Sequence, residues 1–363
     1  MFKENERTKD MKIKLAILDK DISYLNRMVS AFGTKYADKL ELYSFSDEKI
    51  AMESLEVNKI DLLLASDLFD IDTTVLPRRC AFAYLVDSSD IETVKNQVAI
   101  CKFQKADLIY KQILSLYSEK ASNISGLKLN DTDSKIIIFS SPCGGTGTST
   151  MAAACAKQLA RGGKKVLYLD LQLYGSVDSF FEGEGQFDMS DIIYALKSKK
   201  ANTSLKIESC LKRDSSGVYF FSQPKVILDM MELGTEDVNR LISEIRISGG
   251  FEYLIIDKDF GISKSDFEIY GQANHIVVVG DGSLVSNGKV VNAYGAIKTL
   301  EENMDVAISN RMSLIYNKFS NKIGKVIENI ELPNSTGAPR FQHASEKDVV
   351  EQLATMSLFV ALV

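Results

Sequence analysis

Short apolar runs alternate with segments of helix length along the chain. Runs that indicate strands occur at residues 14–18, 62–65, 81–86, 136–139, 166–169, 253–256, 276–279 and 313–316. Because their apolar residues are consecutive rather than alternating with polar ones, these strands are expected to be buried on both faces. Strands separated by helices form right-handed crossovers and parallel sheets. The pattern therefore predicts an α/β protein with doubly wound, mostly parallel sheets.

A polar stretch divides this pattern in two. Residues 119–134, EKASNISGLKLNDTDS, are rich in turn-forming side chains and predict a linker. The linker separates a first domain at 11–118 from a second at 135–363, which suits a typical domain size of about 150 residues. Residues 1–10 are mostly charged and are expected to form a disordered tail. The apolar end, MSLFVALV, is too short to cross a bilayer and is expected to complete a core.

The charge balance limits the partners that the chain can bind. Lys and Arg total 43 and Asp and Glu total 49, which gives a net charge of −6. Non-specific binding to nucleic acid or anionic lipid requires a basic surface, and the most basic stretch, 197–213, is expected to be a solvated helix face. The five cysteines include no C-x-x-C pair, which indicates reduced thiols. We therefore expect a cytoplasmic protein that neither binds nucleic acid nor inserts into a membrane.

A glycine-rich loop joins a buried strand to a helix. The strand KIIIF is followed by SSPCGGTGTST at 140–150 and by the helix former MAAACAKQLA. This arrangement gathers unpaired main-chain N–H groups and the positive end of the helix dipole, which together favour a phosphate. The candidate phosphate-binding residues are Gly144, Gly145, Thr146, Gly147, Thr148, Ser149 and Thr150. The Ser149 hydroxyl stands where it would bind Mg²⁺.

This loop resembles the deviant P-loop of the MinD/ParA ATPases, KGGxGK[ST][ST]. The chain has CGGTGTST there, so the glycines and the hydroxyls are kept and both lysines are absent. Cys143 replaces the lysine that in the family reaches the nucleotide of a partner subunit. Thr148 replaces the lysine that contacts the β- and γ-phosphates. The resemblance implies ATP and Mg²⁺ as ligands and a homodimer as the assembly.

The second domain follows the same family in order. Asp170 matches the first Asp of the family's D-x-D motif, whereas the second is replaced by Gln172. Asp257 ends the apolar run YLIID, as in a Walker B motif, and the resemblance places it with Ser149 and Asp170 in the first or second shell of Mg²⁺. Asn317 stands where the family reads the adenine edge, and Pro333 belongs to the Leu-Pro segment that follows.

The absent lysines affect the expected chemistry. An ammonium group about 4 Å from a phosphate oxygen contributes roughly 4 kcal/mol at an effective dielectric near 20, before desolvation is subtracted. Loss of one charge-stabilising donor typically slows a reaction about 10²–10³-fold. We therefore expect weaker ATP binding and at most weak ATPase activity. Lys258, next to Asp257, is either a substitute cation or an ordinary surface lysine.

The first domain resembles a response-regulator receiver. The residues at the positions of the receiver pocket are Asp19, Asp21, Ser66, Asp67, Ser88 and Lys111. Ser66 occupies the place of the phosphorylated aspartate, and Asp67 follows it on the opposite face of the strand. The resemblance therefore indicates an atypical receiver that serves for docking rather than phosphorylation.

A receiver-like domain followed by a lysine-poor MinD/ParA-type P-loop domain resembles the TadZ/CpaE family. That family implies a localisation and scaffold factor for assembly of Flp-type (Tad) pili at a cell pole, with pilus and secretion proteins as partners. The alternative is an active ParA/MinD-type ATPase that partitions DNA or another cargo. That alternative requires a loop lysine and a basic DNA-binding face.

Overall fold

The computed structural model describes residues 12–120, 134–198, 202–304, 306–328, 330–333 and 337–362. The chain forms two compact units. Unit 1 comprises Met1–Leu127 and Lys199–Ser209, and unit 2 comprises Lys128–Ser198 and Cys210–Val363. Both are α/β folds with mostly parallel sheets, which confirms the predicted fold class.

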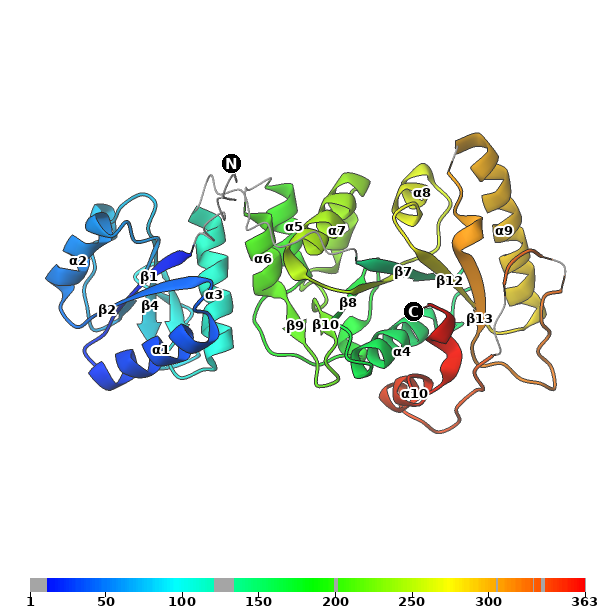
Figure 1. Ribbon diagram of the computed structural model, residues 1–363, viewed down its shortest axis with the longest axis horizontal. Helices are drawn as coiled ribbons and strands as arrows, with labels where there is room; N and C mark the ends of the chain where they lie inside the picture. Colours follow the sequence, from blue (N-terminus) through cyan, green and yellow to red (C-terminus); the bar gives the residue numbers. More distant parts are fainter. Residues whose placement is uncertain are drawn as a thin grey trace, which may run out of the picture. The chain divides into compact units, whose positions relative to one another are not determined.

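Unit 1 is built on a six-stranded sheet in the order β2-β1-β3-β4-β6-β5 (Figure 1). The strands are β1 (Ile13–Leu18), β2 (Leu40–Phe45), β3 (Leu62–Ser66), β4 (Ala81–Val86), β5 (Thr93–Val94) and β6 (Gln97–Cys101). All neighbours are parallel except β5, which pairs antiparallel with β6. The parallel pairing places the carboxyl ends of β1, β3, β4 and β6 at one edge.

Three helices and a short 3₁₀ turn complete this sheet within the described part of the first domain. They are α1 (Ile22–Lys35), α2 (Glu48–Val57), η1 (Thr73–Val75) and α3 (Ala106–Lys120). Helices α1 and α3 bury their apolar side chains in one cluster with the sheet, and α2 does so in a second cluster. Tyr24, Leu25, Met28 and Phe32 of α1 are buried because they recur at helical spacing on one face.

The short helix α6 (Thr203–Cys210) lies in the segment that returns to unit 1. Leu205 packs against the cluster formed with α1 and α3. The ammonium group of Lys206, only 6% exposed as a residue, donates to Ser115 Oγ at 2.8 Å. Glu208 Oε1 accepts from Lys39 Nζ at 2.6 Å and from the Tyr110 hydroxyl at 3.4 Å.

This helix bears on two expectations. The predicted domain boundaries stay a prediction, although Lys199–Ser209, inside the predicted second domain, groups with unit 1. The basic stretch 197–213 is solvated only in part: Lys206 is buried, Lys197 and Arg213 are exposed, and residues 199–201 lie outside the described residues. A lysine can be buried when its charge is paired or hydrogen-bonded. The amino-acid composition of the stretch does not show which lysines have such partners.

Unit 2 is built on a seven-stranded sheet in the order β13-β12-β7-β11-β8-β10-β9. The strands are β7 (Lys135–Ser140), β8 (Val166–Asp170), β9 (Lys212–Arg213), β10 (Tyr219–Phe220), β11 (Tyr253–Asp257), β12 (His275–Gly280) and β13 (Met312–Tyr316). All pairs are parallel except β9 with β10. Asp257 pairs in register with both Phe139 and Asp170, so strands β7, β8 and β11 end side by side.

Helices cover this sheet, and α4 lies against its centre (Figure 1). The helices are α4 (Thr148–Arg161), α5 (Met189–Lys197), α7 (Thr235–Gly249), α8 (Lys264–Tyr270), α9 (Leu284–Met304) and α10 (Glu346–Leu353). The 3₁₀ turns are η2 (Val177–Ser179), η3 (Ile227–Glu232), η4 (Ser309–Arg311) and η5 (Ser357–Leu362). Among the helices described, none is both long and apolar enough to span a membrane.

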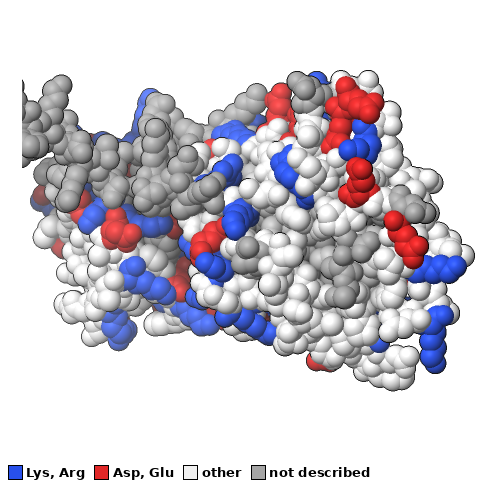
Figure 2. All heavy atoms as spheres, turned by 45° about the vertical axis from the view of Figure 1, so that its right-hand side comes forward, with Lys and Arg blue, Asp and Glu red and all other residues white. Residues whose placement is uncertain are grey.

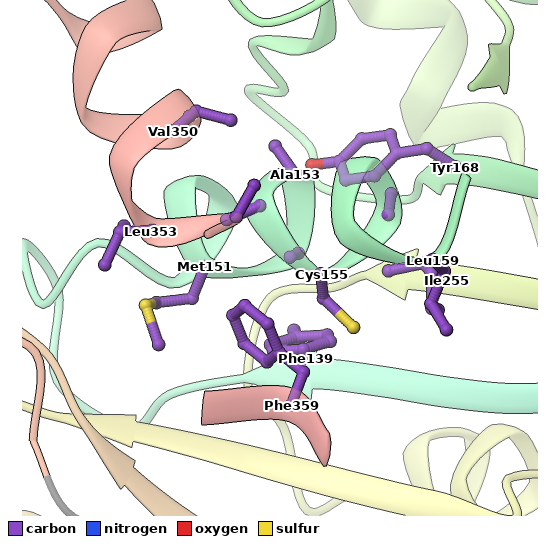
Figure 3. Close-up of a cluster of buried hydrophobic side chains, with 14 of the residues drawn as sticks. Phe139, Met151, Ala153, Cys155, Leu159, Tyr168, Ile255, Val350, Leu353 and Phe359 are labelled. Carbon is purple, nitrogen blue, oxygen red and sulfur yellow. The ribbon is translucent and has the colours of Figure 1, made fainter. Parts of the chain in front are cut away.

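The core of unit 2 lies between α4, the sheet and the C-terminal turns. Figure 3 shows Met151 and Cys155 on the side of α4 where Phe139 and Phe359 lie, and all four belong to one buried cluster. The ring centroids of Phe139 and Phe359 are 6.2 Å apart in an edge-to-face arrangement. Phe359 is fully buried, whereas its neighbour Val360 is 65% exposed. The apolar C-terminal sequence is therefore a core element, as predicted.

Replacement of Phe359 by alanine is expected to lower the free energy of unfolding of unit 2 by about 3–5 kcal/mol, because it leaves a cavity beside Phe139. The matched control is Val360→Ala, which removes apolar atoms that already contact water and is expected to cost under about 0.5 kcal/mol. Urea unfolding followed by circular dichroism measures both. Equal shifts of the two midpoints would contradict the assignment of Phe359 to the core.

Candidate functional site

The glycine-rich loop runs from the end of β7 to the start of α4. Gly144, Gly145 and Thr146 lie in the loop, Gly147 is the N-cap of α4, and the helix begins at Thr148. Gly145 and Gly147 have φ angles of +81° and +85°, which glycine adopts at little cost. No side chain among the described residues caps the start of α4, so its first N–H groups are left available to a ligand. The first turn also contains the predicted residues Ser149 and Thr150.

Asn317 holds this loop from the end of β13. Its Nδ2 donates to the Thr146 carbonyl oxygen at 2.9 Å, and the residue is 2% exposed. A Cβ atom on Gly147 would lie 2.3 Å from the same Nδ2, so this position requires glycine for space as well as for its backbone angle. Pro333 lies beside β13 instead, where its carbonyl accepts the Leu314 N–H at 2.7 Å.

Two carboxylates lie at the ends of β11 and β8. Asp257 is fully buried; its Oδ2 accepts from the Tyr168 hydroxyl at 2.9 Å, and its Oδ1 has no hydrogen-bond partner among the described residues. The Oδ1 and Oδ2 atoms of Asp170 accept the main-chain N–H groups of Gln172 and Ser176, both at 3.0 Å. The two carboxylates are thus held by the strand ends and the loop that follows β8.

Burial raises the pKa of both carboxylates. The pKa of Asp257 rises from 3.8 to about 7, first because burial disfavours its charge and second because Asp170 is nearby. The pKa of Asp170 rises to about 6 through burial, although hydrogen bonds from main-chain N–H groups oppose the rise. A cation in this place would stabilise both charged forms.

The oxygen donors at these strand ends fit Mg²⁺. The Ser149 hydroxyl donates to Gln172 Oε1 at 3.0 Å. Ser149 therefore lies next to Gln172, the residue that replaces the second Asp of the D-x-D motif. The orphaned Asp257 Oδ1 supplies an additional acceptor. Within the described residues no group of three His, Cys, Asp or Glu side chains is placed to hold a metal. Mg²⁺ is commonly held by one or two protein oxygens together with water and phosphate, which matches this donor set.

Lys258 does not lie at the loop. Its Nζ contacts the Asp266 carboxylate and donates to the Asp259 carbonyl at 2.9 Å, and it lies 5.3 Å from the centre of the Tyr270 ring. Sequence reasoning missed a different lysine. Lys318 Nζ donates to the Gly145 carbonyl oxygen at 2.8 Å. Its position directly after Asn317 was the available signal, because Asn317 was already expected at the site.

The receiver-like pocket of unit 1 contains an unexpected lysine. Lys102 directly follows β6, and its Nζ lies 3.1 Å from both Asp19 Oδ2 and Asp87 Oδ1. Burial disfavours the charge of Lys102, but hydrogen bonding to the two carboxylates outweighs this and raises its pKa. Lys111, which was expected here, is instead part of α3. Residues 106–110 resemble a strand in sequence but begin this helix.

The other predicted pocket residues have local roles. Asp19 is buried, and Asp21 caps α1 by accepting the Tyr24 N–H at 3.0 Å. Ser66 is fully buried at the end of β3, whereas Asp67 is exposed. The remaining position, Ser88, accepts the N–H of Asp90 at 3.3 Å. A buried hydroxyl thus occupies the phosphoacceptor place, and the adjacent carboxylate faces solvent.

Comparison with protein families supports both units. A family model described as the CobQ/CobB/MinD/ParA nucleotide binding domain matches residues 137–355. The chain belongs to this family. A second model, the TadZ-like receiver domain, matches residues 11–118. The two matches together give this family member the TadZ/CpaE-like domain architecture that the sequence predicted.

Solved structures resemble the second unit. A ParA family ATPase from Chlorobium tepidum TLS is 20% identical, with a TM-score of 0.50, and the match covers 63% of this chain and 95% of that one. A chain of the MinC:MinD cell division protein complex from Aquifex aeolicus is 20% identical, with a TM-score of 0.46, and the match covers 63% of this chain and 88% of that one. The search of curated proteins found no match. At this identity, the first likeness shows the fold alone.

The raised pKa values predict how stability depends on pH without metal. The folded protein holds protons that the unfolded chain releases between about pH 4 and 7, so stability falls as pH rises across this window. Asp257→Asn removes one buried charge and is expected to flatten this fall and to raise stability at pH 8 by about 1–2 kcal/mol.

Urea unfolding in EDTA at pH 5 to 8 measures this effect. Glu268→Gln, a charge removal at an exposed site on α8, is the control and is expected to leave the pH profile unchanged. A steeper fall in the Asp257→Asn variant would show that the carboxylate is stabilised, rather than destabilised, in its charged form.

Proposed function

We propose that this protein is an ATP-binding localisation and scaffold factor for assembly of Flp-type (Tad) pili at a cell pole, with slow or absent hydrolysis. The observation that carries the proposal is the union of a TadZ-like receiver domain with a MinD/ParA-type loop that has Cys143 and Thr148 at the lysine positions. The first feature favours the pilus-assembly branch of the family. The second favours binding over turnover.

Nucleotide binding is supported by the loop and its neighbours. Main-chain N–H groups of the loop and the start of α4 would hold the phosphates, and Asn317 would read the adenine edge, with Pro333 in the following segment. Ser149, Asp170 and Asp257 would hold Mg²⁺ directly or through water. The bound ion would supply charge neutralisation between the phosphates.

Slow hydrolysis is supported by three replacements. Phosphoryl transfer depends on positioned charges around the transferring group. Cys143 and Thr148 provide no cation, and Gln172 provides no carboxylate to orient water. Lys258 does not compensate, because its ammonium group is paired with Asp266. The residues that remain hold a nucleotide without completing the catalytic set.

Scaffold action is supported by the two-domain design. In an ATP-bridged homodimer, the nucleotide would stabilise the associated state by its differential affinity. Each dimer would present two receiver-like units, and paired weak docking sites gain avidity through effective concentration. The buried Ser66 and the exposed Asp67 favour docking over phosphorylation. On the face that Figure 2 shows, Lys and Arg lie among acidic and uncharged residues, and the net charge of −6 favours protein partners over DNA.

Gly147→Val is expected to abolish ATP binding, because its side chain collides with Asn317 and its φ angle is unfavourable for a branched residue. Isothermal titration with Mg-ATP measures the affinity. Gly295→Ala, in α9 with open space around it, is the matched control and is expected to bind as the unaltered protein does. Unchanged affinity in the Gly147→Val variant would refute the site.

Sedimentation with and without Mg-ATP, followed by phosphate release on the same sample, tests the function. We expect the dimer fraction to increase with ATP while turnover stays far below about 1 s⁻¹, a low value for an enzyme. A small phosphodonor is expected to leave the dimer fraction unchanged, because Ser66 cannot form an acyl phosphate. A monomer under all conditions would refute the scaffold mechanism, and ordinary turnover would favour an active partitioning ATPase.

A further inference from the structure

Two successive residues after β13 hold two successive carbonyl groups of the phosphate loop. Asn317 Nδ2 donates to the Thr146 carbonyl at 2.9 Å, and Lys318 Nζ donates to the Gly145 carbonyl at 2.8 Å. A Cβ atom added to Gly147 would also lie 3.6 Å from Lys318 Cε. The stem of this lysine therefore extends along the loop, and its charged end lies at the glycines that would surround a phosphate.

The backbone fixes this direction. Lys318 has a φ angle of +56°, in the left-handed region that is uncommon for lysine. The residues on both sides are hydrogen-bonded through their main chains, Asn317 N–H to Gly280 at 2.8 Å and Phe319 N–H to Ala338 at 2.8 Å. The turn is thus held in place on both sides of Lys318. A conformation maintained against its intrinsic preference is consistent with a functional position.

The partner of Lys318 distinguishes it from Lys258. Lys258 is paired with the Asp266 carboxylate, whereas Lys318 donates to a neutral carbonyl and is exposed. Over the ranges that the structure describes, no carboxylate lies within ion-pair distance of Lys318 Nζ. Charge-assisted hydrogen bonds to anions are stronger than bonds to neutral acceptors. An arriving phosphate would therefore compete effectively for this ammonium group, which sits on a flexible four-carbon stem.

We infer that Lys318 supplies in cis the cation that the loop lacks at positions 143 and 148. On binding of a nucleoside di- or triphosphate, its ammonium group exchanges the Gly145 carbonyl for phosphate oxygens. This inference rests on the proposed nucleotide site and adds a phosphate-recognising residue from outside the loop. Because Lys318 would contact the phosphate chain, its contribution to nucleotide affinity is expected to increase from the monophosphate to the triphosphate.

Titration of the full-length protein with AMP, ADP and ATP in the presence of Mg²⁺ tests the inference. Lys318→Met keeps the apolar stem beside Gly147 and removes the charge. It is expected to weaken ATP binding about 10- to 100-fold, the usual range for a hydrogen bond to a charged group, and to leave AMP binding nearly unchanged. Lys318→Arg keeps the charge and is expected to retain most of the affinity for ATP.

Lys325→Met is the matched control. Lys325 is exposed in the same connection after β13, and its main-chain N–H donates to Gly282 at 2.9 Å. This substitution makes the same charge change at a side chain that does not touch the loop, so ATP affinity is expected to stay unchanged. An equal loss in both variants would indicate a general charge effect and would overturn the inference.

The remaining outcomes separate this inference from the proposed function. Unchanged or tighter ATP binding by the Lys318→Met variant would overturn it, and tighter binding would show that Lys318 closes the empty loop. Equal weakening for AMP and ATP would also overturn it, because loop shape rather than phosphate contact would then be lost. If the unaltered protein binds none of the nucleotides, the proposed function fails and this inference fails with it.

Discussion

Parallel hydrogen bonding of β7 to both β11 and β12 brings the polar ends of neighbouring strands in unit 2 to one edge. Asp257 pairs with Phe139, and Val278 pairs with Ser140, so the loop after β7 starts between the ends of β11 and β12. Strand β13 extends this edge and delivers Asn317 to the loop. A shift of one residue in any of these pairings would turn the polar end away from the site.

The electrostatic character of this edge follows from what is buried there. Two carboxylates with raised pKa values lie beside a loop that has no cation of its own. Their mutual repulsion and burial are tolerated because main-chain N–H groups and the Tyr168 hydroxyl donate to them. A site of this kind is better suited to a divalent metal with its phosphate ligand than to a phosphate alone.

Sequence reasoning was most successful where chemistry is encoded locally. The strand, the glycines and the helix around 140–150 are consecutive, so their arrangement could be predicted from spacing and residue type. Lys102 was missed because β6 is a short strand that starts with a polar residue, while the first turn of α3, ADLI, has three apolar residues and resembles a strand. The position of Lys318 directly after Asn317 indicated that it lies near the site, but its contact with Gly145 depends on how a turn after β13 directs one flexible side chain. The burial of Lys206 depends likewise on tertiary packing.

Because Lys199–Ser209 groups with unit 1, this unit is built from two segments that are distant in the sequence. Leu205 and Glu208 complete the packing around α1 and α3, although they lie far beyond Lys120, where α3 ends. A genetic exchange made shortly after α3 would transfer the receiver-like domain without the helix that packs against it. Any recombination of this domain with another partner would have to carry both segments to keep this packing.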